Sequence, residues 1–372
     1  MRHIPSADQQ LLFLRQIQQL LTDATFTSTY KYALLLAIAE LAVELGNDSG
    51  DVLAIPITTL AEKTIALYWQ QTLPYLNSAT RLAPVQMLNT AQTDGSNTEP
   101  HDPISTVFLQ NTAKQAAIIN VLLSLRQAGC QTLAQARLST QWPQAVKQVS
   151  ELLKKMPIKY LQNLNGQTLT FLYDPQLHNG HLLLRHGVMY GLRQFQSIIQ
   201  QLVKQRWTLF IQKLAANQAL IGSQHDLEGF LFGSSRAALV HVEQILKPMQ
   251  NQRCFFCQGQ LTERGSAVDH FIPWSRYPRD TALNFVLAHR TCNGHKSDLL
   301  AAERHLTHWL TRNQQHGAEL YGQLQQIGFS GSPMASHRVA QWAYQQAVQQ
   351  QSYLWLEGKL MEPVGVRVLG WF

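Results

Sequence analysis

The sequence predicts a mainly α-helical protein, and three observations support that fold class. Apolar residues recur at helical spacing through long segments, such as residues 9–24, 29–46 and 142–156. Two apolar, β-prone runs flank Asn165-Gly166, a dipeptide that typically forms the turn of a β-hairpin. Three of the four cysteines lie within residues 254–296, which sets this segment apart as a compact unit of its own.

Composition and periodicity divide the chain into four regions. Residues 1–102 are predicted to be helical and acidic, with 10 Asp and Glu against 5 Lys and Arg, and to end in a polar linker. Residues 103–249 are predicted to be helical and basic, and their first part, 103–225, holds 12 Lys and Arg but only 2 acids. Residues 250–300 are the cysteine-containing unit, and residues 301–372 are a C-terminal helical extension.

The uneven charge predicts a surface that binds a polyanion. The chain has a net charge of +7, and its basic region alone exceeds that value. Such a concentration of Lys and Arg is typical of nucleic-acid binding, although a solvated basic face is the alternative. We also hypothesise that the acidic region covers the basic one in an inhibited state. One segment, residues 182–220, is predicted to be helical and contains no acid. It holds the candidates for contacting nucleic acid, although their spacing does not place all of them on one helical stripe: Arg185, Arg193, Lys204, Arg206 and Lys213.

The sequence predicts a cytoplasmic protein without a membrane segment. Its most apolar run, YALLLAIAELAV, is too short to span a bilayer and contains Glu40. Residues 1–10 lack the apolar core of a secretory signal, so a reducing cytoplasm is the expected compartment. The sequence has no phosphate-binding loop motif, which argues against an ATP-driven motor.

Two short pairs of metal-binding side chains predict a structural zinc site. Cys254 and Cys257 are separated by two residues, and so are His289 and Cys292. Structural zinc takes four sulfur or nitrogen ligands at tetrahedral corners, and two such pairs joined by an intervening loop supply them. Isolated buried thiols are the alternative interpretation, and it is the one that we apply to the remaining cysteine, Cys130.

Residues suited to hydrolysing a phosphodiester bond lie between and after these pairs. Asp269-His270 follows a short β-prone run, and Asn293 begins a predicted helix. Histidine is the usual base for deprotonating water near neutral pH. The side-chain oxygens of Asp269 and Asn293 suit Mg²⁺ or Mn²⁺, and such an ion offsets charge on the phosphate and on the leaving oxygen. This combination predicts metal-assisted cleavage.

The order of these residues resembles the HNH endonuclease family, whose core is a ββα-metal fold. The matching features are the CxxC pair, Asp269-His270 with a proline shortly after, a strand that starts at Asn284, and a second pair followed by Asn293. The resemblance implies that His270 is the general base and that Asp269 and Asn293 hold one Mg²⁺ or Mn²⁺ ion. It also implies that Asn284 braces the loop between strand and helix and that Lys296 contacts phosphate.

With this resemblance, the predicted fold is a helical N-terminal region with a β-hairpin, plus a ββα-metal HNH domain with structural zinc. Arg276 and Arg279, in the loop after His270, are further candidates for contacting the nucleic-acid backbone, with a solvated loop as the alternative. The implied activity is metal-dependent hydrolysis of DNA. Because one site cuts one strand, the enzyme is expected to nick, and a double-strand break requires a homodimer or successive nicks.

The implied biological role is bacterial restriction or anti-phage defence, because helical regions fused to HNH domains are common among such nucleases. Partner proteins of a defence system are expected on the same ground. Two other functions stay open. A non-catalytic zinc-containing nucleic-acid-binding protein predicts salt-sensitive binding without cleavage. A toxin or effector nuclease predicts non-specific cleavage of RNA or DNA under the restraint of a partner.

Overall fold

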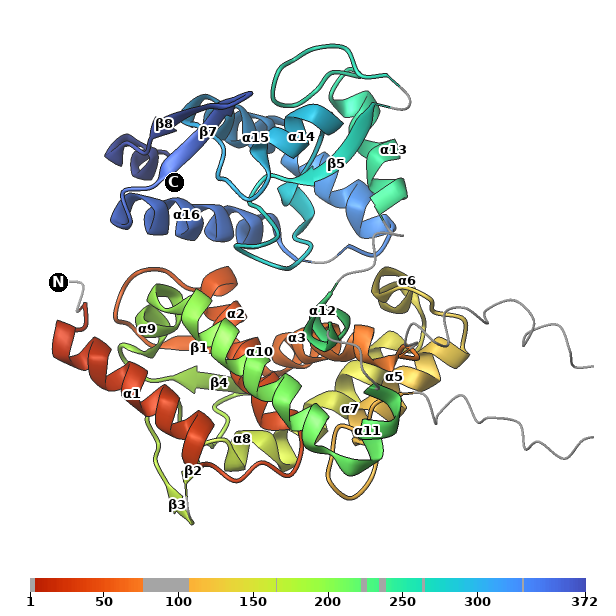
Figure 1. The fold of residues 1–372 in the computed structure, drawn as a ribbon, viewed down its shortest axis with the longest axis vertical. Helices are drawn as coiled ribbons and strands as arrows, with labels where there is room; N and C mark the ends of the chain where they lie inside the picture. Colours follow the sequence, from red (N-terminus) through yellow and green to blue (C-terminus); the bar gives the residue numbers. More distant parts are fainter. Residues whose placement is uncertain are drawn as a thin grey trace, which may run out of the picture.

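Two bodies make up the fold, and Figure 1 shows them one above the other. We call residues 4–233 the N-terminal domain and residues 239–372 the C-terminal domain, because each has its own hydrophobic core. The predicted polar linker lies outside the described residues. The structure is a computed structural model, and it describes residues 4–75, 107–164, 166–221, 226–233, 239–262, 265–329 and 331–372.

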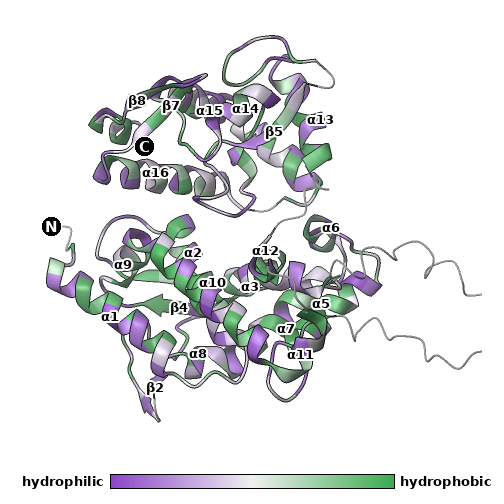
Figure 2. Cartoon of the chain, viewed as in Figure 1, coloured by the Kyte–Doolittle hydropathy of each residue, from purple (hydrophilic) through white to green (hydrophobic). Residues whose placement is uncertain are grey.

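Helices form most of the N-terminal domain. The first begins at a capping box, in which the Ser6 hydroxyl accepts from the Gln9 N–H and the Gln9 side chain accepts from the Ser6 N–H. Figure 2 shows alternating hydrophobic and hydrophilic bands along this helix, as expected for one that covers a core. The helices are α1 (Ala7–Asp23), α2 (Tyr30–Leu45), α3 (Ile57–Trp69), α5 (Ala117–Gln127), α6 (Leu133–Leu138), α7 (Trp142–Lys155), α8 (Pro157–Tyr160), α9 (Val188–Gln194), α10 (Gln196–Lys213), α11 (Ala215–Ile221) and α12 (Leu227–Phe232), with a 3-10 turn η1 (Gln70–Thr72) after α3.

Helix α2 is the centre of the N-terminal domain. Every residue from Tyr32 to Val43 is buried, so the helix has no polar face. A helix that is apolar on all sides belongs in a core, where each fully buried leucine contributes roughly 1.5–3 kcal/mol. Glu40 is the one charged residue in this buried run. Val43 belongs to the core of the C-terminal domain, so α2 contributes to both cores.

Two small antiparallel sheets complete the N-terminal domain. Strand β1 (Leu53–Pro56) pairs with β4 (His181–Leu184). Residues 182–184 of β4 were predicted to be helical, and that prediction is wrong, because pairing between strands far apart in the chain leaves no local periodic signal. The predicted β-hairpin is confirmed, although its strands β2 (Asn163–Leu164) and β3 (Gln167–Thr168) are short. Gly166 takes a φ of +85° at the turn.

The C-terminal domain is built around a ββα unit. Strand β5 (Ser266–His270) runs antiparallel to β6 (Phe285–His289), and helix α14 (Arg290–Lys296) follows β6 directly. This unit and the helical N-terminal domain confirm the predicted fold class. No helix in the described part of the chain is both long and apolar enough to cross a membrane. The other elements are α13 (Leu239–Met249), η4 (Ala282–Asn284), α15 (Glu303–Gln326), α16 (Pro333–Gln349), β7 (Tyr353–Glu357), β8 (Leu360–Pro363) and η5 (Val366–Trp371).

The two cores group the chain differently from the four regions of the sequence analysis. Helices of the acidic and basic regions, such as α2 and α7, share the N-terminal core. Helix α13, which the analysis assigned to the basic region, packs in the C-terminal core through Val242 and Leu246. The ββα unit shares that core with the C-terminal extension, where Phe271 stacks on Trp309 at 5.1 Å between ring centroids. The four regions therefore form two folded units.

Helix α2 also joins the two domains. Helix α16 packs against it, and Figure 1 shows α16 along the face of the C-terminal domain nearest to the N-terminal domain. Arg338 of α16 donates a 2.6 Å hydrogen bond to the carbonyl of Gly46, which caps the end of α2. A cation at this end is favoured by the helix dipole. The Trp342 ring N–H donates to the carbonyl of Arg193 at 2.8 Å, so directional bonds as well as apolar contact fix the arrangement.

Candidate functional site

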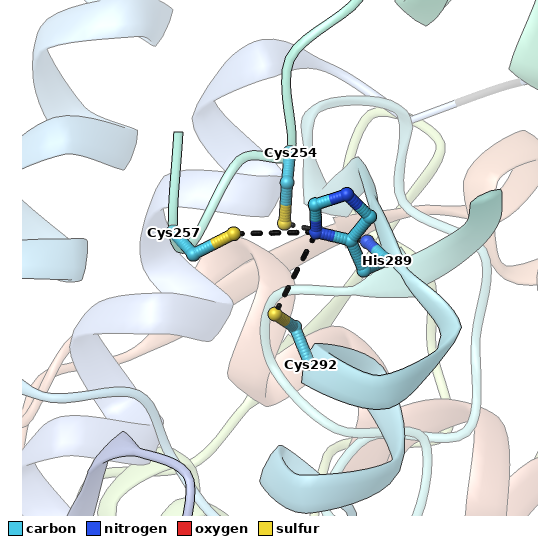
Figure 3. Close-up of side chains that lie close together, drawn as sticks. All are labelled: Cys254, Cys257, His289 and Cys292. Carbon is cyan, nitrogen blue, oxygen red and sulfur yellow. Dashed lines mark hydrogen bonds between the residues drawn. The ribbon is translucent and has the colours of Figure 1, made fainter. Parts of the chain in front are cut away.

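Four side chains of the predicted zinc set converge at one point. Cys254 and Cys257 lie in the loop after α13, His289 ends β6, and Cys292 lies near the start of α14 (Figure 3). Their ligand atoms lie within 4.8 Å of one another, and His289 Nδ1 is 3.2 Å from Cys257 Sγ and 4.0 Å from Cys292 Sγ. Tetrahedral zinc holds its ligand atoms roughly 3.5–3.8 Å apart, given metal–ligand bonds of about 2.0–2.3 Å. The cluster therefore fits a structural zinc ion.

Contacts around the cluster orient its ligands. His289 Nε2 lies 3.0 Å from the carbonyl oxygen of Gln260, which accepts the ring proton and leaves Nδ1 for a metal. The backbone N–H of His289 donates to Cys254 Sγ at 3.3 Å. Gly259 passes so close that a Cβ there would lie 3.2 Å from the His289 ring. A larger residue at 259 would therefore push the ring away from the position that ligation requires.

The thiols differ in how readily they ionise. Burial acts to raise the pKa of the Cys257 thiol, but hydrogen bonds from the Gly259 N–H and from His289 outweigh it, so the pKa is lowered. Burial, together with the charge of Cys254, raises the pKa of the Cys292 thiol to about 12. Zinc ligation requires thiolates, so zinc uptake should release the Cys292 proton.

Asp269 and His270 end strand β5. Asp269 is 8% exposed, and the His270 side chain is 14% exposed. The imidazole contacts the rings of Trp274 and Phe285, with both pairs of centroids 5.1 Å apart. Its Nε2 lies 2.8 Å from Asp280 Oδ1. The histidine is thus partly open to a substrate, while its ring is fixed by two aromatic contacts and one carboxylate.

Lys296 is buried, so the phosphate contact predicted for it is not accessible. Its side chain is fully buried, and Nζ donates a 3.0 Å hydrogen bond to the carbonyl of His270. The ammonium is 2.9 Å from Asp269 Oδ2, which is ion-pair distance although the angles do not make a hydrogen bond. The physical reason for the difference is that a buried ammonium requires an anion nearby, and Asp269 supplies it. Lys296 ties α14 to the end of β5.

The two asparagines lie in different surroundings. Asn284 is 1% exposed, and its amide accepts from the N–H of Ile272 at 2.7 Å and donates to the carbonyl of Ile272 at 3.0 Å. Asn293 is half-buried in α14, and its amide forms no hydrogen bond within the described residues. Asp269 Oδ2 likewise lacks a hydrogen bond there. Helix α14 packs against β5, so Asn293 and Asp269 lie on neighbouring elements, and Asp269 Oδ2 lies at ion-pair distance from the Lys296 ammonium.

Comparison with known families assigns both domains. Residues 10–231, more than half of the chain, match the family described as Domain of unknown function (DUF8808). The chain belongs to the DUF8808 family. Residues 254–302 match the family described as HNH endonuclease. No curated protein and no solved structure was found to match the chain.

The match to the HNH endonuclease family confirms the resemblance found in the sequence. It begins at the first residue of the zinc cluster and covers the whole ββα unit, so the C-terminal domain contains an HNH endonuclease domain. Such a domain supports a nuclease, with nucleic acid as its substrate. The DUF8808 match ends within α12, near the boundary between the two cores, and the N-terminal domain is called the DUF8808 domain below.

Six of the seven basic residues predicted to contact nucleic acid are exposed or half-buried, and only Arg193 is buried. In the DUF8808 domain, Arg185, Arg206 and Lys213 are exposed and Lys204 is half-buried. In the HNH domain, Arg276 is half-buried, and burial lowers its pKa. The three exposed residues remain the most accessible candidates for contacting a phosphate backbone.

Arg193 and Arg279 are bound to acidic residues instead, which corrects the prediction for both. Arg193 is 1% exposed, and its guanidinium binds Asp48 Oδ1 at 2.6 Å and the carbonyl of Val43 at 2.9 Å. Burial lowers the pKa of Arg193, and the charge of Asp48 opposes this. Arg279 binds both carboxylate oxygens of Glu40 at 2.8 Å. Both were predicted from their charge, and charge does not show whether an arginine faces solvent or a buried carboxylate.

Replacing Arg193 by alanine is expected to destabilise the protein without weakening DNA binding. The change removes hydrogen bonds to a charged group, which typically contribute roughly 1.5–3 kcal/mol. Thermal unfolding and a gel shift below both unfolding transitions check this. Arg185→Ala is the exposed control and should leave stability unchanged while weakening binding modestly. An Arg193→Ala protein with normal stability and reduced DNA affinity would contradict the assignment.

Asp280 is a residue of the site to which the sequence alone assigned no role. This residue lies ten positions after His270, in a loop whose two arginines drew attention as DNA contacts. A carboxylate that follows a candidate base within one loop is the signal that points to it. Spacing alone does not show whether the loop folds back toward His270, and only the three-dimensional contact identifies Asp280 as its partner.

Proposed function

We propose that this protein is a metal-dependent endonuclease that hydrolyses DNA phosphodiester bonds. The observation that best supports the proposal is the setting of His270 at the end of β5 in the HNH domain. There the imidazole is partly exposed, adjoins Asp269 in the chain, and is hydrogen-bonded to Asp280. A histidine with one nitrogen engaged and one free fits the role of general base.

In the proposed reaction, His270 accepts the proton of the attacking water. An Mg²⁺ or Mn²⁺ ion held by Asp269 and Asn293 would offset charge on the scissile phosphate and on the leaving 3′ oxygen. Asn284 keeps the main chain after His270 fixed through both of its bonds to Ile272. His270 and Asp269 therefore keep a constant relative position, which reduces the entropy lost in reaching the transition state.

DNA is the proposed substrate because the chain carries a net positive charge. Its net charge is +7, and Arg185, Arg206 and Lys213 are exposed on the DUF8808 domain. With one HNH site in each chain, the proposed product is a nick, and a homodimer or two events would give a double-strand break. By analogy of domain arrangement, the proposed setting is cytoplasmic restriction or phage defence with partner proteins.

Incubation of supercoiled plasmid with the purified full-length protein tests this proposal. Conversion to open circles in Mg²⁺ or Mn²⁺, and none in EDTA, is expected. A uniformly labelled RNA of similar length is the parallel substrate. Preference for RNA would replace the DNA assignment with an RNA-directed effector. A retained salt-sensitive gel shift without cleavage in either metal would leave a non-catalytic nucleic-acid-binding protein.

A further inference from the structure

We propose that Asp280 is a positioning residue for His270 and that the DUF8808 domain holds Asp280 in place through Glu40. This inference rests on the proposed nuclease function, and it gives the DUF8808 domain a task in that function. It follows from a line of contacts that runs from α2 to the candidate base. Asp280 contacts His270, Arg279 precedes Asp280 in the chain, and Arg279 binds the buried Glu40 of the DUF8808 domain.

The first contact fixes the base. Asp280 Oδ1 lies 2.8 Å from His270 Nε2, and a carboxylate oxygen accepts a hydrogen bond from a protonated ring nitrogen. This bond keeps the proton on Nε2 and leaves the lone pair on Nδ1. The rings of Trp274 and Phe285 limit rotation of the imidazole. The Asp280 carboxylate thus selects both the tautomer and the orientation that a general base requires.

The second contact anchors the loop that bears Asp280. Arg279 donates from Nε to one Glu40 oxygen and from Nη2 to the other, both at 2.8 Å. Burial acts to lower the pKa of Arg279, but the charge and hydrogen bonds of Glu40 outweigh it, so the pKa is raised. Tyr277, two residues earlier, donates to Glu44 Oε1 at 2.7 Å. Both acceptors belong to α2, so the loop is tied to the DUF8808 domain at two points.

The Asp280 side chain lies at the edge of an opening between the domains and is 31% exposed. A cavity of about 450 Å³ lies between the domains, and Arg279, Asp280 and Thr281 form part of its wall. The opposite wall comes from the DUF8808 domain, including Lys63 and Arg137. On this side the Asp280 carboxylate borders open space, whereas Tyr277 and Thr281 in the same loop are buried. The bidentate pair to a fully buried Glu40 adds a directional anchor at the residue before Asp280, because neither member can shift without losing two hydrogen bonds.

Two variants of the full-length protein test the inference in plasmid-cleavage kinetics. Asp280→Asn is expected to lower kcat by about 10–100-fold, the usual cost of removing a group that orients a reacting ligand, with KM for DNA unchanged. Glu40→Gln is expected to lower kcat in the same direction with the same unchanged KM. In a His270→Ala background Asp280→Asn should have no further effect, because Asp280 acts through His270. Glu40→Gln combined with Asp280→Asn should be no slower than Asp280→Asn alone.

Asp48→Asn is the matched control. It weakens the Asp48–Arg193 pair, which also lies beside the contact between α2 and α16 but away from the loop of Asp280. It is expected to lower the unfolding temperature while kcat per folded molecule stays at the wild-type value. If Glu40→Gln does not fold, Arg279→Lys keeps the charge, loses the bidentate geometry, and should give the same fall in kcat.

The outcomes separate the inference from the function on which it rests. Absence of cleavage by the wild-type protein in every metal overturns the proposed function. Wild-type cleavage with an Asp280→Asn kcat at or above the wild-type value overturns the positioning role alone. An impaired Asp280→Asn together with a Glu40→Gln that behaves like Asp48→Asn overturns the link between the domains.

Discussion

Alanine in place of His270 is expected to lower the rate of plasmid cleavage by about 10²–10⁴-fold, the usual contribution of a positioned base. The change removes the atom that accepts the proton of water but leaves the metal donors and the basic surface in place. DNA affinity in a gel shift should therefore equal that of the wild-type protein. Thermal stability should fall little, because the imidazole borders the surface and its side chain is 14% exposed.

Two comparisons make this result specific. His316→Ala removes an exposed histidine from α15, outside the ββα unit, and should cleave at the wild-type rate. Zinc content measured on the His270→Ala protein should equal that of the wild type, because the zinc cluster uses His289. Loss of zinc from His270→Ala would show that the ligand assignment is wrong. Full cleavage by the His270→Ala protein would show that His270 is not the general base.

Loss of a zinc ligand is expected to unfold the region of residues 250–300. Cys257→Ala removes one of the four converging ligands, and structural zinc in small folded units contributes about 10–16 kcal/mol of apparent binding free energy. That is as large as the whole stability of an ordinary domain, about 5–15 kcal/mol. The variant should lose its zinc, lose cleavage, and exchange backbone amide hydrogens rapidly over 250–300. Metal analysis and hydrogen-exchange mass spectrometry measure these effects.

Cys130→Ala is the matched control for this experiment. Cys130 is 6% exposed in the core of the DUF8808 domain, so the change also removes one sulfur but leaves the zinc cluster intact. It should retain one zinc per chain and normal exchange over 250–300. A Cys257→Ala protein that binds zinc as tightly as the wild type, with unchanged exchange, would show that the cluster is not a structural metal site.

Local patterns in the sequence predicted the features that depend on neighbouring residues. The zinc ligands come as two pairs with fixed short spacing, and the unit between them is a short antiparallel pair of strands joined by a loop. Helix α2 was predictable because a long apolar run leaves few alternatives in water. Gly166 follows Asn165 between two β-prone runs, so the hairpin turn was predictable as well.

Features that depend on distant residues could not be predicted in this way. Strand β4 forms because β1 lies beside it, and nothing within the β4 segment distinguishes it from the helix that follows. Arg193 and Arg279 looked like surface cations because charge is visible in a sequence and burial is not. Their partners, Asp48 and Glu40, lie 145 and 239 residues away in the chain. Long-range pairs of this kind determine which basic residues are free to bind a ligand.

The order of the ion-pair partners along the chain has a consequence for biosynthesis. Glu40 is made 239 residues before Arg279. At a synthesis rate of about 5–20 residues per second, the ribosome takes roughly 10–50 s to pass from one to the other, and domains generally fold in the order in which they emerge. The helix bearing Glu40 therefore has time to fold before the loop of the nuclease emerges from the ribosome. A chain cut between Glu40 and Arg279 would separate the two partners, so under the proposed link neither fragment would hold Asp280 against His270.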